Sequence, residues 1–401
     1  MKGAAWTSRS RASRLERILS VRHLRWMQVD WHLLVIAVVL LLVGVRFIHA
    51  MEEADLVFDR DSVDFASHLR KVLVAVPMLA LGLFLRPRWL RRNAWLLYVV
   101  TLALLVLVPF IGVERNYARR WIPLPGLGFD LQPSELAKLG LILILASVLY
   151  RSRLQRVDDW VLPVVLTVLP MGLVALQPDL GTALTIVPIT LGMLYLAGAR
   201  GSTLLGMVAA CALAGLLAAR FDVLHDYQTQ RIQTWIDAWD SERLIADRNG
   251  PAFHTYHARV SIGNGGWTGT GMGKGVANES AHLPERDCDS IIAVIAEEAG
   301  FLGTAGLLLL YALLIVLLFA SASHIRERFS RLVVGGISLY FASHFFINVG
   351  VNLGLVPMTG LTLPLLSTGG SSLLVTFLAL GLALGLSAHQ EPTLDQDAFR
   401  A

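Results

Sequence analysis

The feature that most constrains this chain is the recurrence, from Leu33 to Ser387, of apolar runs about as long as a membrane span. A transmembrane helix needs about 20 consecutive apolar residues. Lipid offers no partner for backbone hydrogen bonds, so such runs must fold as helices. Only 16% of the residues are charged, against roughly 25% in soluble proteins, which excludes an ordinary soluble enzyme. The sequence therefore predicts an all-α polytopic membrane protein.

Ten runs are candidate transmembrane helices. They are residues 33–48, 72–85, 94–111, 134–150, 161–176, 181–197, 204–219, 291–320, 332–349 and 371–387. The eighth run is longer than one span requires, which predicts that it starts outside the hydrocarbon and is tilted or kinked near Gly300 and Gly303. The expected organisation is a basic N-terminal segment (1–31), a membrane domain (32–388) with one large extracytoplasmic loop (220–289), and a short tail (389–401).

The positions of the basic residues predict the orientation, because cytoplasmic loops carry an excess of Lys and Arg. The N-terminal segment and every second connection are rich in arginine, whereas the first intervening loop is acidic and the last is uncharged. Both termini and the short tail are therefore expected in the cytoplasm. The N-terminus lacks a cleavage site, so the first span is expected to stay as an anchor. A formal net charge of +4 gives no argument for nucleic-acid binding, and two cysteines are too few for a disulfide framework.

One loop breaks the charge rule. Residues 112–133 should be external, yet they include Arg115, Arg119 and Arg120. Contact with lipid headgroups would account for these arginines. An outward-facing anion site would also account for them, because guanidinium groups bind phosphate in a bidentate manner.

Several polar residues fall at or near the outer ends of spans, where ionisable groups are costly to hold and are candidates for function. Glu135 and Lys138 are spaced i,i+3, so they could bind substrate or simply pair with each other. Asp179 precedes the sixth span and could contact substrate or cap the following helix. His344 and Asn348 lie one helical turn apart on the ninth span, and we expect both to face the bundle.

The large external loop contains a dense series of glycines between Ile262 and Gly275. Such a segment can lie close against a ligand or another chain, and a flexible linker is the alternative. It is not a Walker A loop, because Gly275 follows Lys274 where Ser or Thr is required. It also does not follow a strand, which excludes a dinucleotide-binding fold.

The same loop ends in an acidic run with Glu285, Asp287 and Asp289. In an extended chain these side chains would share one face, and their repulsion would raise a pKa as a general base requires. Asp289 could instead cap the next helix. Glu297 and Glu298, about two turns further on, must face protein or water.

The last external segment, residues 357–372, is uncharged and is expected to be irregular and to line a cavity. Together with the acidic run and the arginines of residues 112–133, it places the candidate chemistry on the external face.

Seven short blocks occur in an order that resembles the SEDS family (shape, elongation, division, sporulation), most closely its RodA branch. The blocks are Arg120-Trp121-Ile122, Gln132-Pro133-Ser134-Glu135-Leu136-Ala137-Lys138, Gln177-Pro178-Asp179-Leu180-Gly181-Thr182, Ile262-Gly263-Asn264-Gly265-Gly266, Leu283-Pro284-Glu285-Arg286, Ala296-Glu297-Glu298, and Pro357-Met358-Thr359-Gly360 with Ser371-Ser372. They cover nearly the whole chain beyond the basic N-terminus.

The resemblance implies a ten-span peptidoglycan glycosyltransferase of the bacterial inner membrane that polymerises lipid II on the outer face and supports cell-wall elongation and shape, or division. The implied partner is a class B penicillin-binding protein, which cross-links the glycan strands. The family's catalytic aspartate corresponds to Asp289. The family's Arg-Trp pair corresponds to Arg120 and Trp121, and its outer-face lysine corresponds to Lys138. The aspartate of its Gln-Pro-Asp motif corresponds to Asp179. Its Tyr-Gln…Arg element corresponds to Tyr227, Gln228 and Arg231.

This chain departs from the family pattern at several of these positions. Where the family usually has His-Thr-Asp-Phe, residues 287–290 read Asp-Cys-Asp-Ser, which leaves two carboxylates competing for the role of base. Tyr117 stands where glycine is common, His257 and His344 where glutamine is common, and Thr368 where tyrosine is common.

The expected reaction is attack by the acceptor 4-hydroxyl on the anomeric carbon of the growing strand, with inversion and loss of undecaprenyl pyrophosphate. Asp289 would remove the hydroxyl proton, and Arg120, helped by Lys138 or Arg115, would offset the leaving-group charge. Glu135 and Asp287 complete the expected substrate-binding set.

No ligand spacing identifies a cofactor, although a divalent cation, Mg²⁺ or Mn²⁺, could lie between the acidic residues and the pyrophosphate. The alternatives are a lipid II flippase, an O-antigen-type ligase or polymerase, and a non-catalytic scaffold for the transpeptidase.

Overall fold

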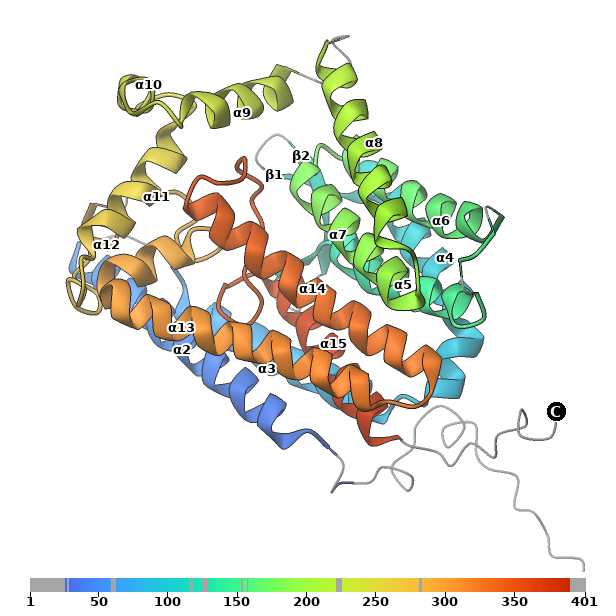
Figure 1. Ribbon diagram of the computed structural model, residues 1–401. Coiled ribbons are helices and arrows are strands. Elements are labelled where there is room, and N and C mark those ends of the chain that lie inside the picture. Colours follow the sequence, from blue (N-terminus) through green and yellow to red (C-terminus); the bar gives the residue numbers. More distant parts are fainter. Residues whose placement is uncertain are drawn as a thin grey trace, which may run out of the picture.

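The computed structural model describes Trp26 and residues 29–58, 63–115, 118–124, 129–152, 154–156, 158–220, 226–280 and 283–389 (Figure 1). Ten helices coincide with the ten candidate spans. They are α2 (Trp31–Val57), α3 (Phe65–Phe84), α4 (Pro87–Ile111), α5 (Pro133–Leu149), α6 (Asp158–Leu176), α7 (Leu180–Ala197), α8 (Gly201–Arg220), α13 (Ile291–His324), α14 (Arg328–Asn352) and α15 (Gly370–Ala388).

Seven of these helices are long and apolar enough to cross a membrane, namely α2, α3, α4, α6, α13, α14 and α15. The chain is therefore an all-α polytopic membrane protein. The basic N-terminal segment and the C-terminal tail lie almost entirely outside the described residues, so the predicted boundaries of these parts stay predictions.

The core of the bundle lies along α14 and α15, which are buried over most of their length. α3 runs along α15, while α13 packs on α2 and on α14. The approach of α3 to α15 depends on glycine, because a methyl group at Gly381 or Gly385 would collide with the carbonyl groups of Leu79 and Leu83. Small residues allow helices to pack this closely where no hydrophobic effect drives them together.

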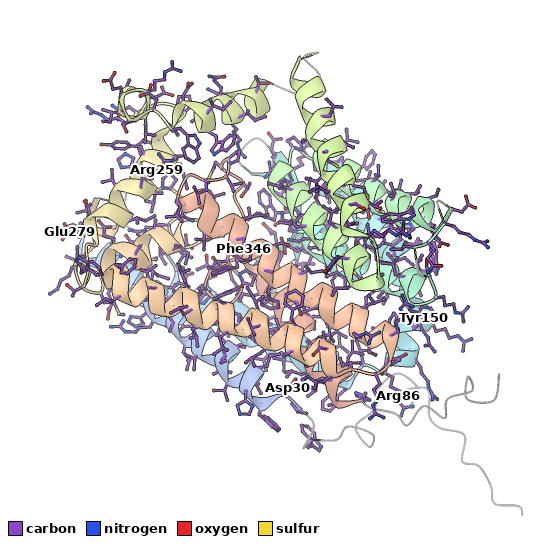
Figure 2. The ribbon with its side chains drawn as sticks, viewed as in Figure 1. Asp30, Arg86, Tyr150, Arg259, Glu279 and Phe346 are labelled. Atoms are coloured by element: carbon purple, nitrogen blue, oxygen red, sulfur yellow. The ribbon has the colours of Figure 1, made fainter. Side chains whose placement is uncertain are left out.

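The arginine-rich connections lie together at one end of the bundle. Arg328 donates to the carbonyl oxygens of Ser152 (2.7 Å) and Ala197 (2.8 Å), and Arg91 pairs with Glu327 at 3.1 Å. Figure 2 shows Asp30, Arg86 and Tyr150 toward this end and Arg259 and Glu279 toward the other. The arginine-rich connections, which are every second connection along the chain, thus lie at the same end of the bundle, as the charge pattern predicts.

Three short antiparallel strands follow α4. They are β1 (Val113–Arg115), β2 (Ala118–Leu124) and β3 (Phe129–Leu131), in the order β1-β2-β3. The hydroxyl group of Ser371 ties this sheet to the start of α15, since it donates to the carbonyl oxygen of Asp130 (2.6 Å) and accepts from the Gln132 amide (2.7 Å). The sequence predicts only a loop here.

Within residues 226–280 and 283–289, which the structure describes, the large loop folds into four short helices, α9 (Asp226–Asp237), α10 (Ser241–Ala246), α11 (Phe253–Asn264) and α12 (Val276–Ser280). α11 packs on α13. The helices α9 and α10 form an arm at one end of the bundle (Figure 1).

The glycine run between α11 and α12 inserts into a break in α13. The break lies at Gly300, where φ is +65°, so the predicted kink is confirmed. A break leaves backbone groups without helical partners, and the glycine run supplies them. The amides of residues 270 and 271 donate to the carbonyls of residues 297 and 298, and the amides of residues 301 and 302 donate to the carbonyls of residues 266 and 267, at 2.8–3.1 Å. The flexible-linker alternative is therefore wrong.

Candidate active site

The loop before α13 is held from three sides. Arg286 is buried and pairs with the buried Asp55 of α2. From α14, the amides of Asn348 and Asn352 donate to the carbonyl oxygen of Asp289 at 3.0 and 2.9 Å. The expectation that His344 and Asn348 face the bundle is confirmed, since both are buried.

The third side of the loop is the irregular segment before α15. Its Ser367 hydroxyl donates to the carbonyl oxygen of Cys288, and its Thr368 hydroxyl donates to the carboxylate of Asp287. Residues 284–289 form turns rather than an extended chain, so the extended arrangement that would align Glu285, Asp287 and Asp289 on one face is absent.

Asp289 lies beneath the surface, with 6% of the residue exposed. The N-cap position of α13 is occupied by Ser290, so Asp289 is not the cap. Its Oδ1 atom lies 3.3 Å from the Ser290 hydroxyl and 3.7 Å from Nε2 of His254 on α11. Gly360 lies close to Oδ2, since a Cβ atom built there would be 3.8 Å away.

Arg120 projects from β2 toward the turn between α6 and α7. Its guanidinium donates to the carbonyl oxygens of Gln177 (3.2 Å) and Pro178 and lies 3.8 Å from Asp179. Asp179 caps α7, because its Oδ1 accepts the Thr182 amide at 3.2 Å. The capping role of Asp179 is confirmed, and contact with substrate stays a prediction.

A cavity of about 690 Å³ joins these elements. Arg120 lines one wall, Arg231 and Trp235 of α9 line another, and His254 of α11 lies on the wall beside Asp289. Met358, from the irregular segment, completes the cavity and accepts a hydrogen bond from Arg231 at 3.2 Å. The structure thus places two of the predicted arginines on the lining of one cavity, and the predicted aspartate contacts His254, another residue of that lining.

Glu135 and Lys138 pair with each other inside the bundle. The Lys138 ammonium group is fully buried, 2.7 Å from Glu135 and 2.7 Å from Nε2 of His344. Among the described residues, those that line the cavity do not include this pair. The pairing alternative is confirmed, and contact of either residue with substrate stays a prediction.

Glu297 and Glu298 are buried, as expected. They bind the part of the large loop that comes before residues 283–289. Glu297 accepts from the Asn264 amide (3.0 Å) and from the backbone of Ala277 (2.9 Å), and Glu298 accepts from Asn278. These carboxylates therefore fix the glycine run and α12 against α13.

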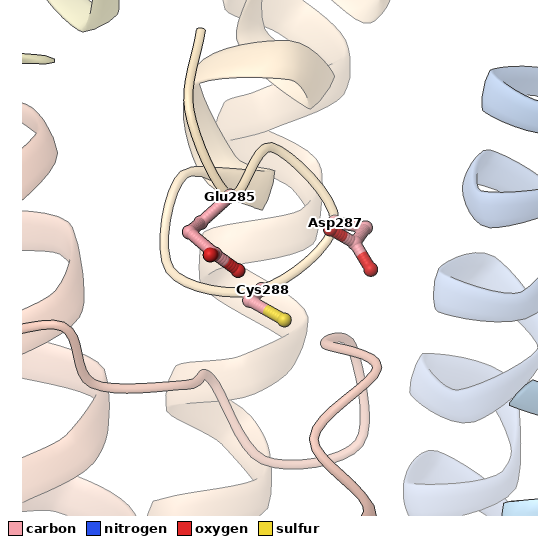
Figure 3. Close-up of side chains that lie close together, drawn as sticks. All are labelled: Glu285, Asp287 and Cys288. Atoms are coloured by element: carbon pink, nitrogen blue, oxygen red, sulfur yellow. The ribbon is translucent and has the colours of Figure 1, made fainter. Parts of the chain in front are cut away.

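Two carboxylates and one thiol form a cluster on the loop before α13. The ligand atoms of Glu285, Asp287 and Cys288 lie within 4.8 Å of one another (Figure 3). Burial, reinforced by the charge of Asp287, raises the pKa of the Cys288 thiol well above its usual value. Mg²⁺ and similar hard cations prefer oxygen ligands, so the two carboxylates of this cluster are the groups that suit a divalent cation.

Some of the residues predicted to bind substrate are not placed at the cavity by the structure. Trp121 lies on β2 opposite Val113. The side chains of Arg115, Tyr227 and Gln228 lie outside the described residues. In contrast, His254 and Ser290 contact Asp289 although the sequence did not single them out as site residues. Only tertiary structure joins them, because His254 is 35 positions from Asp289 along the chain and no motif spacing links the two.

The comparisons with known proteins agree with this geometry. The family model for FtsW, RodA and SpoVE, described as cell cycle proteins, matches residues 30–392. The chain is 35% identical over 322 residues to a probable peptidoglycan glycosyltransferase FtsW of Halomonas elongata, covering 78% of each chain. It is 34% identical to the peptidoglycan glycosyltransferase MrdB of Escherichia coli, covering 76% of this chain and 80% of that protein.

Two solved structures are also similar. A chain of a peptidoglycan synthase complex that coordinates polymerization and crosslinking matches with a TM-score of 0.76 and 32% identity, over 91% of this chain and 100% of the other. The rod shape determining protein RodA of Thermus thermophilus matches with a TM-score of 0.66 and 31% identity, over 90% and 97%. This chain belongs to the FtsW/RodA/SpoVE family of membrane proteins.

Proposed function

We infer that this chain is a peptidoglycan glycosyltransferase that polymerises lipid II into β-1,4-linked glycan strands. One observation carries this inference beyond family membership. A cavity lined by the two guanidinium groups of Arg120 and Arg231 meets a buried carboxylate, Asp289, through His254. A lipid-linked diphosphate sugar needs both features, an anion site for the diphosphate and a carboxylate for proton removal.

In the proposed reaction the 4-hydroxyl of one lipid II molecule attacks the anomeric carbon of the growing strand. The carboxylate of Asp289 takes the proton of this hydroxyl group. General-base catalysis of this kind is worth roughly 10²–10⁴ in rate. The bond from the anomeric carbon to the phosphate oxygen breaks, and undecaprenyl pyrophosphate leaves with the electron pair. Single displacement inverts the anomeric centre.

The leaving diphosphate is placed against the arginines of the cavity. Arg120 has 21% of its side chain exposed, and its orientation is fixed by the carbonyls of Gln177 and Pro178. A fixed cation needs no rearrangement as charge develops, which favours the transition state. Arg231, which lines the same cavity and donates to the carbonyl oxygen of Met358, supplies the second positive charge.

We place this cavity on the extracytoplasmic side of the bacterial inner membrane. The arginine-rich connections lie at the other end of the bundle, and such loops are normally cytoplasmic. A class B penicillin-binding protein is the proposed partner, as the similarity to a chain of a peptidoglycan synthase complex supports.

A divalent cation is a further part of the proposal. Glu285 and Asp287 would hold Mg²⁺ or Mn²⁺, since Mg²⁺ is commonly bound by one or two carboxylates together with substrate phosphates. Such an ion would neutralise charge on the diphosphate.

The test is polymerisation of purified lipid II by the full chain with its transpeptidase partner, followed by gel analysis of the glycan product. Asp289→Asn should reduce the rate by about 10²–10⁴, whereas Glu242→Gln, an exposed carboxylate on α10, should match the wild type. Asp287→Asn should cost less than Asp289→Asn. Chelation by EDTA should stop product formation, and added Mg²⁺ or Mn²⁺ should restore it.

A folded Asp289→Asn variant with undiminished product would remove Asp289 from the mechanism. If Asp287→Asn alone abolished the product, Asp287 would be the base. A wild-type protein that binds the transpeptidase but makes no glycan would favour a scaffold, and translocation of lipid II in liposomes without polymerisation would favour a flippase.

A further inference from the structure

Ser290 holds the N-cap position of α13 but does not cap the helix. Serine is among the preferred N-cap residues because its hydroxyl accepts a hydrogen bond from the first turn. Here the hydroxyl makes no such bond. It lies 2.6 Å from Nε2 of His254, 3.2 Å from the carbonyl oxygen of Pro284 and 3.3 Å from Oδ1 of Asp289. The side chain is directed at the candidate active site instead.

The single hydroxyl hydrogen limits how these contacts can be made. A serine hydroxyl has one donor and two acceptor positions. If it donates to the carboxylate of Asp289 or to the carbonyl of Pro284, then Nε2–H of His254 must donate to the hydroxyl oxygen. Only this arrangement satisfies both the serine and an oxygen acceptor, and when that acceptor is Asp289 it leads from the imidazole through the hydroxyl to the carboxylate.

The backbone of Asp289 is fixed separately from its side chain. Asn348 and Asn352 of α14 hold its carbonyl oxygen. The contacts of its carboxylate come from the loop itself and from α11, that is, from Ser290 at 3.3 Å and His254 at 3.7 Å. His254 also lines the cavity, so the carboxylate lies next to a residue of the cavity lining.

We propose that Ser290 and His254 act as a positioning pair that orients the carboxylate of Asp289 toward the cavity. The proposal rests on the proposed function, because it assigns these residues to the same reaction. A misplaced catalytic group can cost about 100-fold in rate for a displacement of about 1 Å, so loss of the pair acts on the rate of the chemical step rather than on substrate affinity.

Other titratable groups surround His254. Asp289 is nearest, Arg120 of β2 and Arg231 of α9 line the same cavity, and His257 lies one turn further along α11. Glu297, on α13, contacts the far end of α11 through Asn264.

The experiment compares three variants of the full chain with its transpeptidase partner in the lipid II assay. Ser290→Ala removes the hydroxyl, and His254→Leu removes the ring nitrogens. His254→Gln keeps a donor near the position of Nε2 but cannot titrate as imidazole does. Ser323→Ala is the matched control, because Ser323 is an exposed serine of the same helix whose hydroxyl bonds only to the Ala320 carbonyl.

Ser290→Ala and His254→Leu should each lower kcat by about 10-fold or more with KM within about twofold. His254→Gln should recover most of the lost rate, and the double variant Ser290→Ala/His254→Leu should be no slower than the slower single variant. Thermal unfolding in detergent shows whether each variant is folded, and a variant that does not fold is replaced by Ser290→Thr, which should keep the rate.

Three results would overturn the proposal. These are a wild-type kcat for Ser290→Ala, a His254→Gln variant as slow as His254→Leu, or effects confined to KM. Failure of the proposed function is distinguishable, because the wild-type chain would then make no glycan, or Asp289→Asn would be as active as the wild type.

Discussion

At the residue scale, the departures from the family pattern occur in contacting sets. Asp287 stands where the family usually has histidine, and it bonds to Thr368, which stands where tyrosine is common. Ser290 replaces phenylalanine and meets His254. His344 replaces glutamine and contacts the Lys138 ammonium. Each of these four side chains thus has a polar partner, as buried polar groups require.

The buried ion pair of α5 gives a prediction about stability. Lys138→Met leaves Glu135 charged and without its cation inside the bundle, which typically costs about 3–5 kcal/mol. We expect a clear fall in the unfolding temperature measured in detergent. The double variant Glu135→Gln/Lys138→Met, which removes both charges, should lose much less.

A Lys138→Met variant as stable as the wild type would contradict this view of the pair. If that variant kept its stability and still lost polymerase activity, contact between Lys138 and substrate would become the better explanation.

At the element scale, the break in α13 and the glycine run form one unit. Each supplies the backbone partners that the other lacks. Gly265 and Gly263 make a matched pair for testing it. A methyl group at Gly265 would overlap the Ala296 carbonyl, whereas a methyl group at Gly263 meets nothing within 4 Å.

Gly265→Ala should therefore destabilise the protein by about 1–3 kcal/mol, the usual cost of overpacking. Gly263→Ala should be neutral or stabilising by up to about 1 kcal/mol, since alanine favours helix over glycine. Thermal unfolding of the two variants side by side gives the comparison. Equal stability of both would show that the glycine run is not packed against α13.

The sequence predicted elements well where a local pattern determines them. All ten candidate spans are helices, because length and hydropathy alone force that outcome in lipid. The kink at Gly300 followed from excess length and glycine. The strands β1–β3 did not follow, because each is short and forms only by pairing with its neighbour.

The candidate site was predictable only in part for the same reason. Asp289, Arg120 and Arg231 came from ordered motifs. The structure brings the two arginines to one cavity and Asp289 to His254 on its lining. The contact of His254 with Ser290, and the turn that separates Asp289 from Glu285, depend on tertiary packing and backbone geometry. No spacing in the sequence encodes either.

At the scale of the whole molecule, the proposed orientation can be tested by labelling. In a background with Cys211→Ser and Cys288→Ser, Thr234→Cys introduces a thiol on the cavity wall, and Ser323→Cys introduces one near the arginine-rich end of α13. A membrane-impermeant maleimide applied to spheroplasts should label the first variant and not the second. Permeabilised cells should label both, and the reverse pattern in intact spheroplasts would invert the topology.

The ion pair between Arg286 and Asp55 has a mechanical consequence. Asp55 belongs to α2, a helix with one side exposed on the bundle surface, and Arg286 lies three residues before Asp289 on a short, tightly held loop. A tilt or slide of α2 therefore pulls directly on the loop that carries the carboxylate. Bilayer thickness, which sets the tilt of a spanning helix, is thereby linked to the candidate active site through the Arg286–Asp55 ion pair and through the packing of α2 on α13.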